Sequence, residues 1–575
     1  MLAEIIPANV RHGNNRIAMT TFSHLLQRAW NERPAETALI LQHAGQPDRT
    51  ITTADLLRGA AGYARSLEEA GIRPGEVVIL ILQHGVEHVF AYFGTILHGA
   101  IPSIMPFLTE KLLPERYRSD LAALIGVTLP AAIITYPAFE VEVRAALKQG
   151  DSVRAVLLDQ YACPPQDPDF SALAGLRRNP EDIVLLQHSS GTTGLQKGVA
   201  LSHQAVLNQL ESYSRALHLD RRDVVVSWLP LYHDMGLIAG FLMPLLTGIP
   251  LVLMSPFDWV RAPVRLLQAV SNYRGTLAWL PNFAYTFCAQ KIRERDLTGL
   301  DLSSWRAVIN CSEPMRHESH QAFYQRFAPY GLRSEALCTC YAMAENVFAV
   351  TQGGIDQSVT IDPIEREGLQ SGWVARPAQD GAALVKMVSA GPPVAGVEVK
   401  IVDPDGKTLP ERSIGEVALR SNCMLSEYYN RPDETRKAFL DGWYLTGDFG
   451  YLAAGELYIT GRKKDLIIVG GKNVYPQDIE SLAMSVDGVH PGRVVAFGIY
   501  SEDAGTEEVY VVAEADGDGF GGREQIADTV RRIVNQGSAI ALRHVYLVDP
   551  GWLVKTSSGK IARGANREKY QREVG

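Results

Sequence analysis

The feature that most constrains this sequence is the alternation of short, fully apolar runs with helical patterns through most of its length. The runs are bounded by turn residues and lie at 77–82, 131–135, 154–158 and 224–229. Amphipathic helices are expected at 53–70, 86–98, 204–217 and 262–273. Strands that are apolar on both faces and alternate with helices are typical of parallel sheets covered by helices. The sequence therefore predicts an α/β fold with layered, mostly parallel sheets.

The pattern changes near residue 390, where strand and turn signals alternate without helices. This predicts a small β-rich subdomain over about 390–461. A dense polar stretch at 462–465 then precedes another apolar run. We expect an N-terminal domain over 1–461, a hinge at 462–465 and a small, mobile α+β C-terminal domain over 466–575.

Composition excludes several classes of protein. Hydrophobic residues make up 46% and charged residues 21%, the balance of a folded globular chain. The net charge of −9 offers no general attraction for polyanions, so nucleic-acid binding is not expected. Six cysteines are too few for a disulfide scaffold and no secretory signal is visible, which predicts a cytoplasmic location. The apolar segment 239–257 contains three prolines, so no stable membrane insertion is expected.

The stretch 186–199 has the composition of a phosphate-binding loop. Small residues let backbone N–H groups approach phosphate oxygens, hydroxyls add hydrogen bonds, and a lysine adds positive charge. The loop is not of the Walker A type, because Gly198 follows the lysine. A flexible surface loop is the alternative for this stretch taken alone. The residues expected to contact phosphate are Ser189, Ser190, Gly191, Thr192, Thr193, Gly194 and Lys197.

This loop resembles the signature of the adenylate-forming superfamily, which contains acyl-CoA synthetases, luciferase and the adenylation domains of peptide synthetases. Further motifs resembling that superfamily follow in the expected order. The segment 228–236 resembles the one with a gate beside the acyl pocket, which implies this role for His233. The segments 310–314 and 341–345 resemble the two that bracket the adenine. In the second segment the resemblance implies that Glu345 binds Mg²⁺, a cation that prefers carboxylate and phosphate oxygens.

The same resemblance implies roles for residues around the nucleotide. Tyr341 would offer its ring face to adenine, and Asp448 and Arg462 would bind the ribose. Lys464 would mark the hinge, and Lys560 would bridge the attacking carboxylate and the nucleotide phosphate. The residues expected around the adenine are Cys311, Ser312, Glu313, Pro314, Tyr341, Ala342, Met343 and Ala344.

Within the superfamily, the chain most resembles the fatty acyl-AMP ligases, through the segments 281–285, 300–305 and 475–480. The segment 352–388 matches the position of an extra segment in that group, where it is thought to restrain the C-terminal domain. An ordinary surface loop is the alternative interpretation. The resemblance implies ATP and Mg²⁺ as cofactors, a fatty acid as the substrate and acyl transfer to a carrier protein.

The acceptor and the acyl pocket are less constrained by the sequence. We expect an acyl carrier protein that acts in trans, for which Arg531, Arg532 and Arg543 are candidate contacts unless they are simply solvated. The acyl pocket is expected at residues that could equally belong to the core, namely Trp279, Asn282, Phe283 and Ala284. Two other functions stay open, a fatty acyl-CoA synthetase that uses coenzyme A and a catalytically silent nucleotide-binding scaffold.

Overall fold

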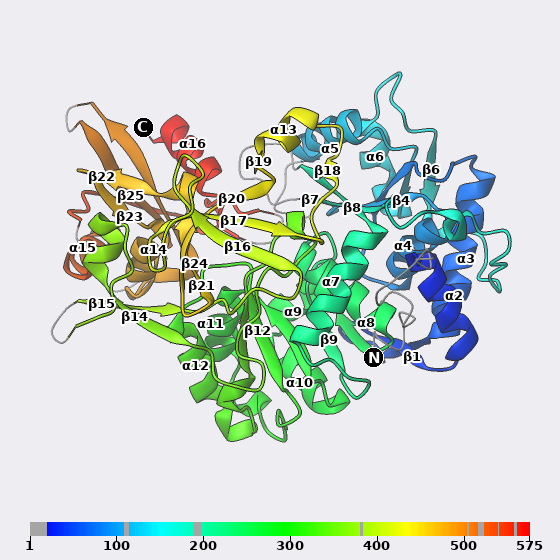
Figure 1. The fold of residues 1–575 in the computed structure, drawn as a ribbon, viewed down its shortest axis with the longest axis horizontal. Coiled ribbons are helices and arrows are strands. Elements are labelled where there is room, and N and C mark those ends of the chain that lie inside the picture. The colour runs from blue at the N-terminus through cyan, green and yellow to red at the C-terminus, as the bar shows by residue number, and fades with distance from the viewer. Residues whose placement is uncertain are drawn as a thin grey trace.

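The protein is a layered α/β molecule in which two large sheets and their helices carry a β-rich part and a smaller C-terminal part (Figure 1). In Figure 1 the C-terminal part is drawn in orange and red, next to the yellow β-rich strands. The computed structural model describes residues 20–107, 114–188, 197–379, 383–502, 505–515, 522–538, 540–556 and 560–574.

The first large sheet has the strand order β13-β12-β11-β9-β10-β1-β2. Its neighbouring strands are parallel except for β1 and β2. The carboxyl ends of the parallel strands therefore meet at one edge, where open α/β sheets bind their ligands. Its strands are β1 (Thr37–Gln42), β2 (Arg49–Thr52), β9 (Val225–Ser227), β10 (Leu251–Met254), β11 (Leu277–Leu280), β12 (Ala307–Cys311) and β13 (Leu337–Cys340).

The second large sheet has the order β18-β8-β7-β4-β3-β5-β6. The strands from β7 to β6 are parallel, whereas β8 is antiparallel to both of its neighbours. The short strand β18 comes from the β-rich part and so ties that part to this sheet. Its strands are β3 (Val77–Ile81), β4 (Ile101–Ile104), β5 (Ala132–Thr135), β6 (Ala155–Leu158), β7 (Ile183–His188), β8 (Gly198–Ser202) and β18 (Glu427–Tyr428).

Helices cover both large sheets, and most of them share one continuous core with the strands, whereas the helices over 114–128 and 140–146 pack in a separate apolar cluster. They are α2 (Phe22–Glu32), α3 (Thr53–Glu69), α4 (Val86–His98), α5 (Pro114–Thr128), α6 (Glu140–Ala146), α7 (His203–Ala216), α8 (Met243–Thr247), α9 (Pro256–Arg261), α10 (Val264–Tyr273), α11 (Asn282–Lys291) and α12 (His317–Phe327). The predicted strands coincide with β3, β5, β6 and β9, and the predicted helices with α3, α4, α7 and α10. The predicted fold class is confirmed.

The β-rich part is an antiparallel sheet that follows residue 390. It consists of β16 (Val397–Val402), β17 (Gly415–Ser421), β19 (Phe439–Leu440), β20 (Trp443–Ala453) and β21 (Glu456–Arg462), with helix α13 (Pro432–Lys437) between β18 and β19. Just before it, the segment 352–388 contains an antiparallel hairpin of β14 (Ile361–Glu365) and β15 (Leu384–Val388). This segment is therefore more regular than a simple surface loop.

The C-terminal part has an apolar core of its own, which includes Ile467, Val511 and Val530. A short turn, Lys463–Asp465, connects it to the end of β21. Its elements are the hairpin β22 (Ile467–Val469) and β23 (Lys472–Val474), the sheet β24 (Val489–Ser501), β25 (Thr506–Ala515) and β26 (His544–Val548), and the helices α14 (Pro476–Met484), α15 (Gly522–Gly537) and α16 (Arg563–Glu573). The mixture of strands and helices is of the α+β type.

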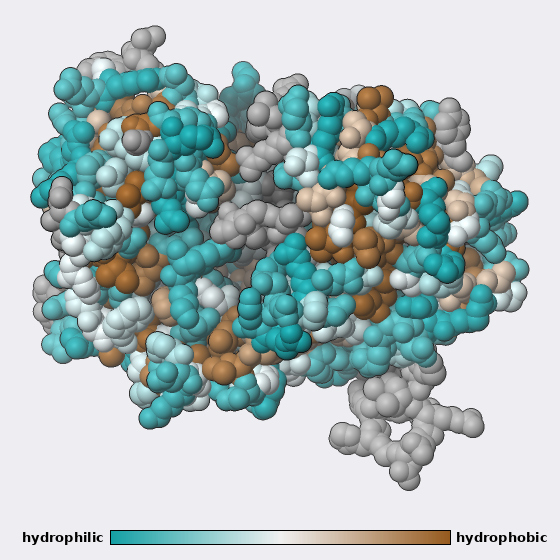
Figure 2. Space-filling view, turned by 90° about the horizontal axis from the view of Figure 1, so that it is seen from above, coloured by the Kyte–Doolittle hydropathy of each residue, from teal (hydrophilic) through white to brown (hydrophobic). Residues whose placement is uncertain are grey.

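The apolar segment 239–257 is not one helix. It contains the end of a π-helical stretch (Met235–Leu242), then α8 and then the buried strand β10. Within the described residues, none of the helices has the length and apolarity that crossing a bilayer requires. On the face seen in Figure 2, hydrophobic residues lie in separate patches among hydrophilic ones.

Candidate functional site

The residues predicted to act together follow the carboxyl ends of strands from both large sheets. β7 leads into the predicted phosphate loop, and β9, β11, β12 and β13 lead into the other predicted segments of the N-terminal domain. The parallel arrangement brings these strand ends to one side of each sheet. Six residues of the loop lie outside the described part of the chain, so their predicted roles stay predictions: Ser189, Ser190, Gly191, Thr192, Thr193 and Gly194.

Tyr341, Asp448 and Arg462 form one cluster, although they come from distant parts of the sequence. The Tyr341 hydroxyl donates to Oδ2 of Asp448 at 2.6 Å. Asp448 on β20 pairs in register with Arg462 on β21, and the Arg462 Nε lies 3.8 Å from the other Asp448 oxygen. Burial raises the pKa of Asp448 although Arg462 acts in the opposite direction. The sheet thus presents a carboxylate and a guanidinium beside an aromatic ring.

The segment after β12 makes a sharp turn. Cys311 is fully buried at the end of the strand, and Ser312 has a left-handed backbone conformation with φ of 69°. Such a conformation is strained for a residue with a side chain and is often found at functional sites. After the turn, Oε2 of Glu313 accepts a hydrogen bond from the Phe283 N–H at 2.9 Å, and Pro314 is exposed.

The segment after β13 places Ala342 and Met343 at half-buried positions, with Ala344 buried behind them. The next residue, Glu345, has a half-buried side chain whose Oε1 accepts a hydrogen bond from the Tyr428 hydroxyl at 2.8 Å. Burial raises the pKa of Glu345, and the charge of Asp234 raises it further, against the effect of the Tyr428 hydrogen bond. A bound cation would relieve the cost of keeping this carboxylate charged.

The donor set suits Mg²⁺ better than a transition metal. No cluster of three His, Cys, Asp or Glu side chains able to hold a metal occurs in the described ranges. Magnesium needs few protein ligands, because one or two carboxylates suffice when substrate phosphates and water supply the rest. Glu345, with Asp234 close enough to influence its pKa, fits that pattern.

Lys560 extends from the C-terminal part to the carboxyl side of the first sheet. Its backbone forms two hydrogen bonds with Thr556, which shape the turn that carries it. Burial lowers the pKa of Lys560, while the charges of Glu313 and Asp234 oppose this effect. Lys560 therefore lies within electrostatic reach of two carboxylates that follow β12 and β9.

His233 and Asp234 stand side by side after β9. The Nδ1 of His233 lies 3.8 Å from Oδ1 of Asp234, which also accepts the Met235 N–H at 2.8 Å. Burial raises the pKa of Asp234, but His233, Lys560 and the Met235 N–H together outweigh it, so the pKa lies below its usual value. The carboxylate is therefore charged at neutral pH and faces two basic side chains.

Lys197 lies directly before β8. Its Nζ is 2.8 Å from Oε2 of Glu434 on α13 and 4.6 Å from the centre of the Tyr428 ring. Tyr428 is almost fully buried, and its hydroxyl lies 2.9 Å from that of Tyr444. Within the protein, the ammonium group of Lys197 therefore has an anionic partner, Glu434, and an aromatic partner, Tyr428.

The residues predicted for the acyl pocket have different surroundings. Trp279 is fully buried, and its indole N–H donates to the Tyr213 hydroxyl at 2.8 Å. Asn282 accepts the Arg316 N–H at 3.2 Å, and Ala284 is fully buried. Phe283 is half-buried, with its ring 6.4 Å from Trp228 and 6.2 Å from Trp259. Those two indoles stack on each other at 3.6 Å.

Polar contacts join the C-terminal part to the site. Arg316, just after the segment predicted to bind adenine, forms an ion pair with Asp478 on α14 at 3.0 Å. Arg563 binds Asp465 at 2.9 Å and Glu480 at 2.7 Å, which links α16 to the end of the connecting turn. Lys464 in that turn is exposed.

Three residues of the site were not predicted from the sequence, namely Asp234, Tyr428 and Glu434. Asp234 directly follows the predicted His233, so a carboxylate inside that motif was a usable signal. Tyr428 and Glu434 lie in no predicted motif, and their approach to Lys197 depends on the pairing of β18 with β8.

Comparisons with known proteins agree with the resemblance found in the motifs. The family model described as AMP-binding enzyme matches residues 26–429. The medium-chain-fatty-acid–[acyl-carrier-protein] ligase JamA of Moorena producens (strain JHB) is 31% identical, over 96% of this chain and 95% of that protein. The long-chain-fatty-acid–AMP ligase FadD26 of Mycobacterium marinum (strain ATCC BAA-535 / M) is 31% identical, over 95% of this chain and 96% of that protein.

A solved structure from a study of the fatty acyl-adenylate ligases of E. coli and L. pneumophila superposes with a TM-score of 0.88. It is 28% identical and covers 96% of this chain and 98% of that one. The match of the family model over most of the sequence, together with these relatives, confirms the predicted recognition. The chain belongs to the AMP-binding enzyme family.

Proposed function

We propose that this protein is a ligase that activates a fatty acid with ATP and then passes the acyl group to an acyl carrier protein acting in trans. In the first step a carboxylate oxygen of the fatty acid attacks the α-phosphorus of ATP. The bond to the bridging oxygen breaks, pyrophosphate leaves, and an acyl-adenylate forms. In the second step the phosphopantetheine thiol of the carrier attacks the acyl carbon, loses its proton and releases AMP.

The observation that carries this proposal is the electrostatic influence of Asp234 and Glu313 on Lys560, at the sheet edge where β9, β12 and β13 end and where Tyr341 and Glu345 also lie. A cation there, within electrostatic reach of two carboxylates, can bind the incoming fatty-acid carboxylate and a phosphate oxygen together. Positioning and electrostatic stabilisation supply most of the acceleration in such a phosphoryl-type displacement. We assign Lys560 this role, and Lys197 the charge next to the departing phosphates.

The remaining assignments follow the clusters already described. The Tyr341 ring would lie against adenine, while Asp448 accepts hydrogen bonds from the ribose hydroxyls and Arg462 contacts the ribose. His233 would stand at the acyl pocket, whose walls include the half-buried Phe283. Glu345 would hold Mg²⁺, which when bound neutralises charge on the phosphate oxygens.

The choice of acceptor rests on the relatives and on the segment 352–388. JamA is named as an acyl-carrier-protein ligase. In the segment, Ile364 and Leu369 pack in one apolar cluster with Tyr475 of the C-terminal part, and Arg366 donates to the carbonyl of Gly537. We propose that these contacts restrain the C-terminal domain, whose hinge lies at 462–465, and that Arg531, Arg532 and Arg543 remain candidate carrier contacts. We also propose a cytoplasmic location.

The experiment offers the full chain ATP, Mg²⁺ and fatty acids of increasing chain length, then holo carrier protein and coenzyme A in parallel. We expect labelled pyrophosphate to exchange into ATP with some acids, and the acyl group to move faster to the carrier. Apo carrier protein, which lacks the thiol, is the control and should receive nothing. Preferential formation of acyl-coenzyme A would favour the synthetase alternative, and ATP binding without exchange for any acid would favour the silent scaffold.

A further inference from the structure

Tyr428 lies between two charged groups of the nucleotide site. It belongs to the two-residue strand β18, which pairs with β8 so that Tyr428 is opposite Val199. This register places it next to the strand that begins directly after Lys197. Its side chain is almost fully buried, so its contacts are made inside the protein and not to solvent.

The hydroxyl of Tyr428 fixes the carboxylate of Glu345. It donates to Oε1 at 2.8 Å, and the nearby Tyr444 hydroxyl, at 2.9 Å from that of Tyr428, completes a short chain of hydroxyl groups. Among the residues that the structure describes, no lysine or arginine forms an ion pair with Glu345. A neutral donor therefore orients this carboxylate and leaves its negative charge available for a cation.

The ring of Tyr428 supports the ammonium group of Lys197, whose Nζ lies 4.6 Å from the ring centre. An aromatic face attracts a cation without neutralising it. The flexible lysine side chain thus gains a fixed support while its charge stays available for phosphate. The hydroxyl of Tyr428 therefore positions Glu345, the carboxylate proposed to bind Mg²⁺. The ring of the same residue positions Lys197, the cation proposed to bind phosphate.

We propose that Tyr428 is a positioning residue that sets Glu345 and Lys197 at the separation that a Mg²⁺–triphosphate requires. This inference rests on the proposed function, because it assumes that both residues meet the nucleotide. It makes two separable claims. The hydroxyl acts on the Mg²⁺-dependent part of ATP binding, and the ring acts on the part that needs no metal.

The test measures ATP binding by calorimetry on the full chain, without metal and across a Mg²⁺ titration. Tyr428→Phe keeps the ring, so metal-free affinity should stay within about twofold, the range expected for an unaltered cation–π contact. The Mg²⁺ concentration for half-maximal enhancement should rise roughly tenfold, as for one lost hydrogen bond to a charged group. Tyr428→Leu should show this change and also lose about threefold in metal-free affinity.

Tyr63→Phe is the matched control, because the Tyr63 hydroxyl on α3 also donates to a glutamate, Glu87 on α4, at 2.7 Å. It should alter neither measurement. If Tyr428→Leu does not fold, Tyr428→Phe alone tests the claim about Mg²⁺-dependent binding. The claim about metal-free binding is then tested with Lys197→Met, which removes the ammonium group directly and should lose at least about threefold in metal-free affinity.

The outcomes separate this inference from the proposed function. The wild-type protein could exchange pyrophosphate while Tyr428→Phe shows the same Mg²⁺ titration as the wild type. That result would overturn this inference and leave the proposed function standing. Equal losses of metal-free affinity and of Mg²⁺ enhancement in Tyr428→Phe and Tyr428→Leu would mean that Tyr428 only supports the fold. A wild-type protein that binds no ATP would remove the proposed function and this inference together.

Discussion

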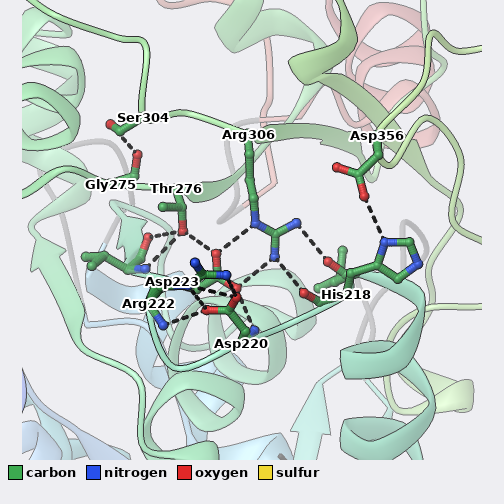
Figure 3. A network of polar contacts seen from close by, with 11 residues as sticks. His218, Asp220, Arg222, Asp223, Gly275, Thr276, Ser304, Arg306 and Asp356 are labelled. Atoms are coloured by element: carbon green, nitrogen blue, oxygen red, sulfur yellow. Dashed lines mark hydrogen bonds and ion pairs between the residues drawn. The ribbon is translucent and has the colours of Figure 1, made fainter.

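The two ends of the first large sheet use buried charge in opposite ways. Before the amino ends of β9, β11 and β12, Arg306 donates to both oxygens of Asp223 at 2.8 Å and to the Leu217 carbonyl at 2.8 Å. The Thr276 hydroxyl donates to the same carboxylate at 2.8 Å (Figure 3). Burial lowers the pKa of Arg306, but Asp223 outweighs this and raises it. Each charge there is satisfied by its partner.

At the carboxyl edge of the same sheet, where β9, β12 and β13 end, the charges are not matched in this way. Glu345 accepts a hydrogen bond from the neutral Tyr428 hydroxyl, and burial raises its pKa. Burial lowers the pKa of Lys560 even though Glu313 and Asp234 oppose it. Perturbed groups of this kind gather where a ligand completes the charge balance. The difference indicates that one end stabilises the fold and the other is prepared to bind.

The largest effect is expected for Lys560→Ala, which removes the cation from the binding end. Acyl-adenylate formation should fall by about two to four orders of magnitude, because one electrostatic contact to the transition state is lost. ATP binding should be largely retained, and both quantities are measured on the same sample. Lys472→Ala, an exposed lysine of the C-terminal part, is the control. Adenylation close to that of the wild type would remove Lys560 from the mechanism.

Removing the ion pair between Arg306 and Asp223 should lower the stability of the fold without changing the rate of adenylation. Arg306→Met leaves Asp223 buried and unpaired, which is expected to cost about 3–5 kcal/mol in unfolding experiments. The rate per folded molecule should stay unchanged. Arg222→Met is the matched control in the same network, because its ion pair with Asp220 is solvent-exposed and worth less than about 1 kcal/mol. A similar loss in both variants would contradict the distinction between the two ends.

Asp234→Asn tests whether the carboxylates at the binding end sustain the charge of Lys560. Without the negative charge the pKa of Lys560 should fall further below its usual value, since burial then meets less opposition. The lysine would lose its proton at lower pH, so the alkaline limb of the adenylation rate should move to lower pH. The maximal rate should drop roughly tenfold, as for one partly screened charge partner.

Two findings would contradict this view of Asp234. The alkaline limb could stay in place or move to higher pH, which would show that Lys560 does not depend on Asp234. Alternatively, Glu313→Gln, which removes the other carboxylate, could move the limb in the opposite direction. Both carboxylates raise the pKa of Lys560, so both variants should displace the limb in the same direction.

The sequence predicts local structure well where burial leaves a continuous mark. The apolar run at 77–82 became β3, and the helical pattern at 53–70 became α3, because a strand buried on both faces and an amphipathic helix each record their surroundings residue by residue. The hairpin of β14 and β15 was missed, since its strands are partly exposed and Pro363 interrupts the first.

Contacts between distant segments produce no local pattern of apolar residues in the sequence. Lys197 was predicted from its loop, but its partners Tyr428 and Glu434 lie far along the chain and meet it only because β18 pairs with β8 over two residues. No periodicity can be recognised in so short a strand. The motifs therefore predict which residues meet the ligand, whereas the groups that hold those residues emerge only from the fold.

The smallest effect is expected for Glu434→Gln, which removes the anionic partner of Lys197. Both side chains of this ion pair are about one-third exposed, so the carboxylate is largely screened and competes only weakly with phosphate for the ammonium group. ATP affinity should rise by no more than about threefold, and the gain should shrink at high salt. Asp433→Asn on the same helix, whose carboxylate pairs with Arg436, should change nothing. A weaker affinity in Glu434→Gln would instead mean that the predicted phosphate site also relies on a satisfied ion pair to position Lys197, which would weaken the contrast with Arg306 and Asp223.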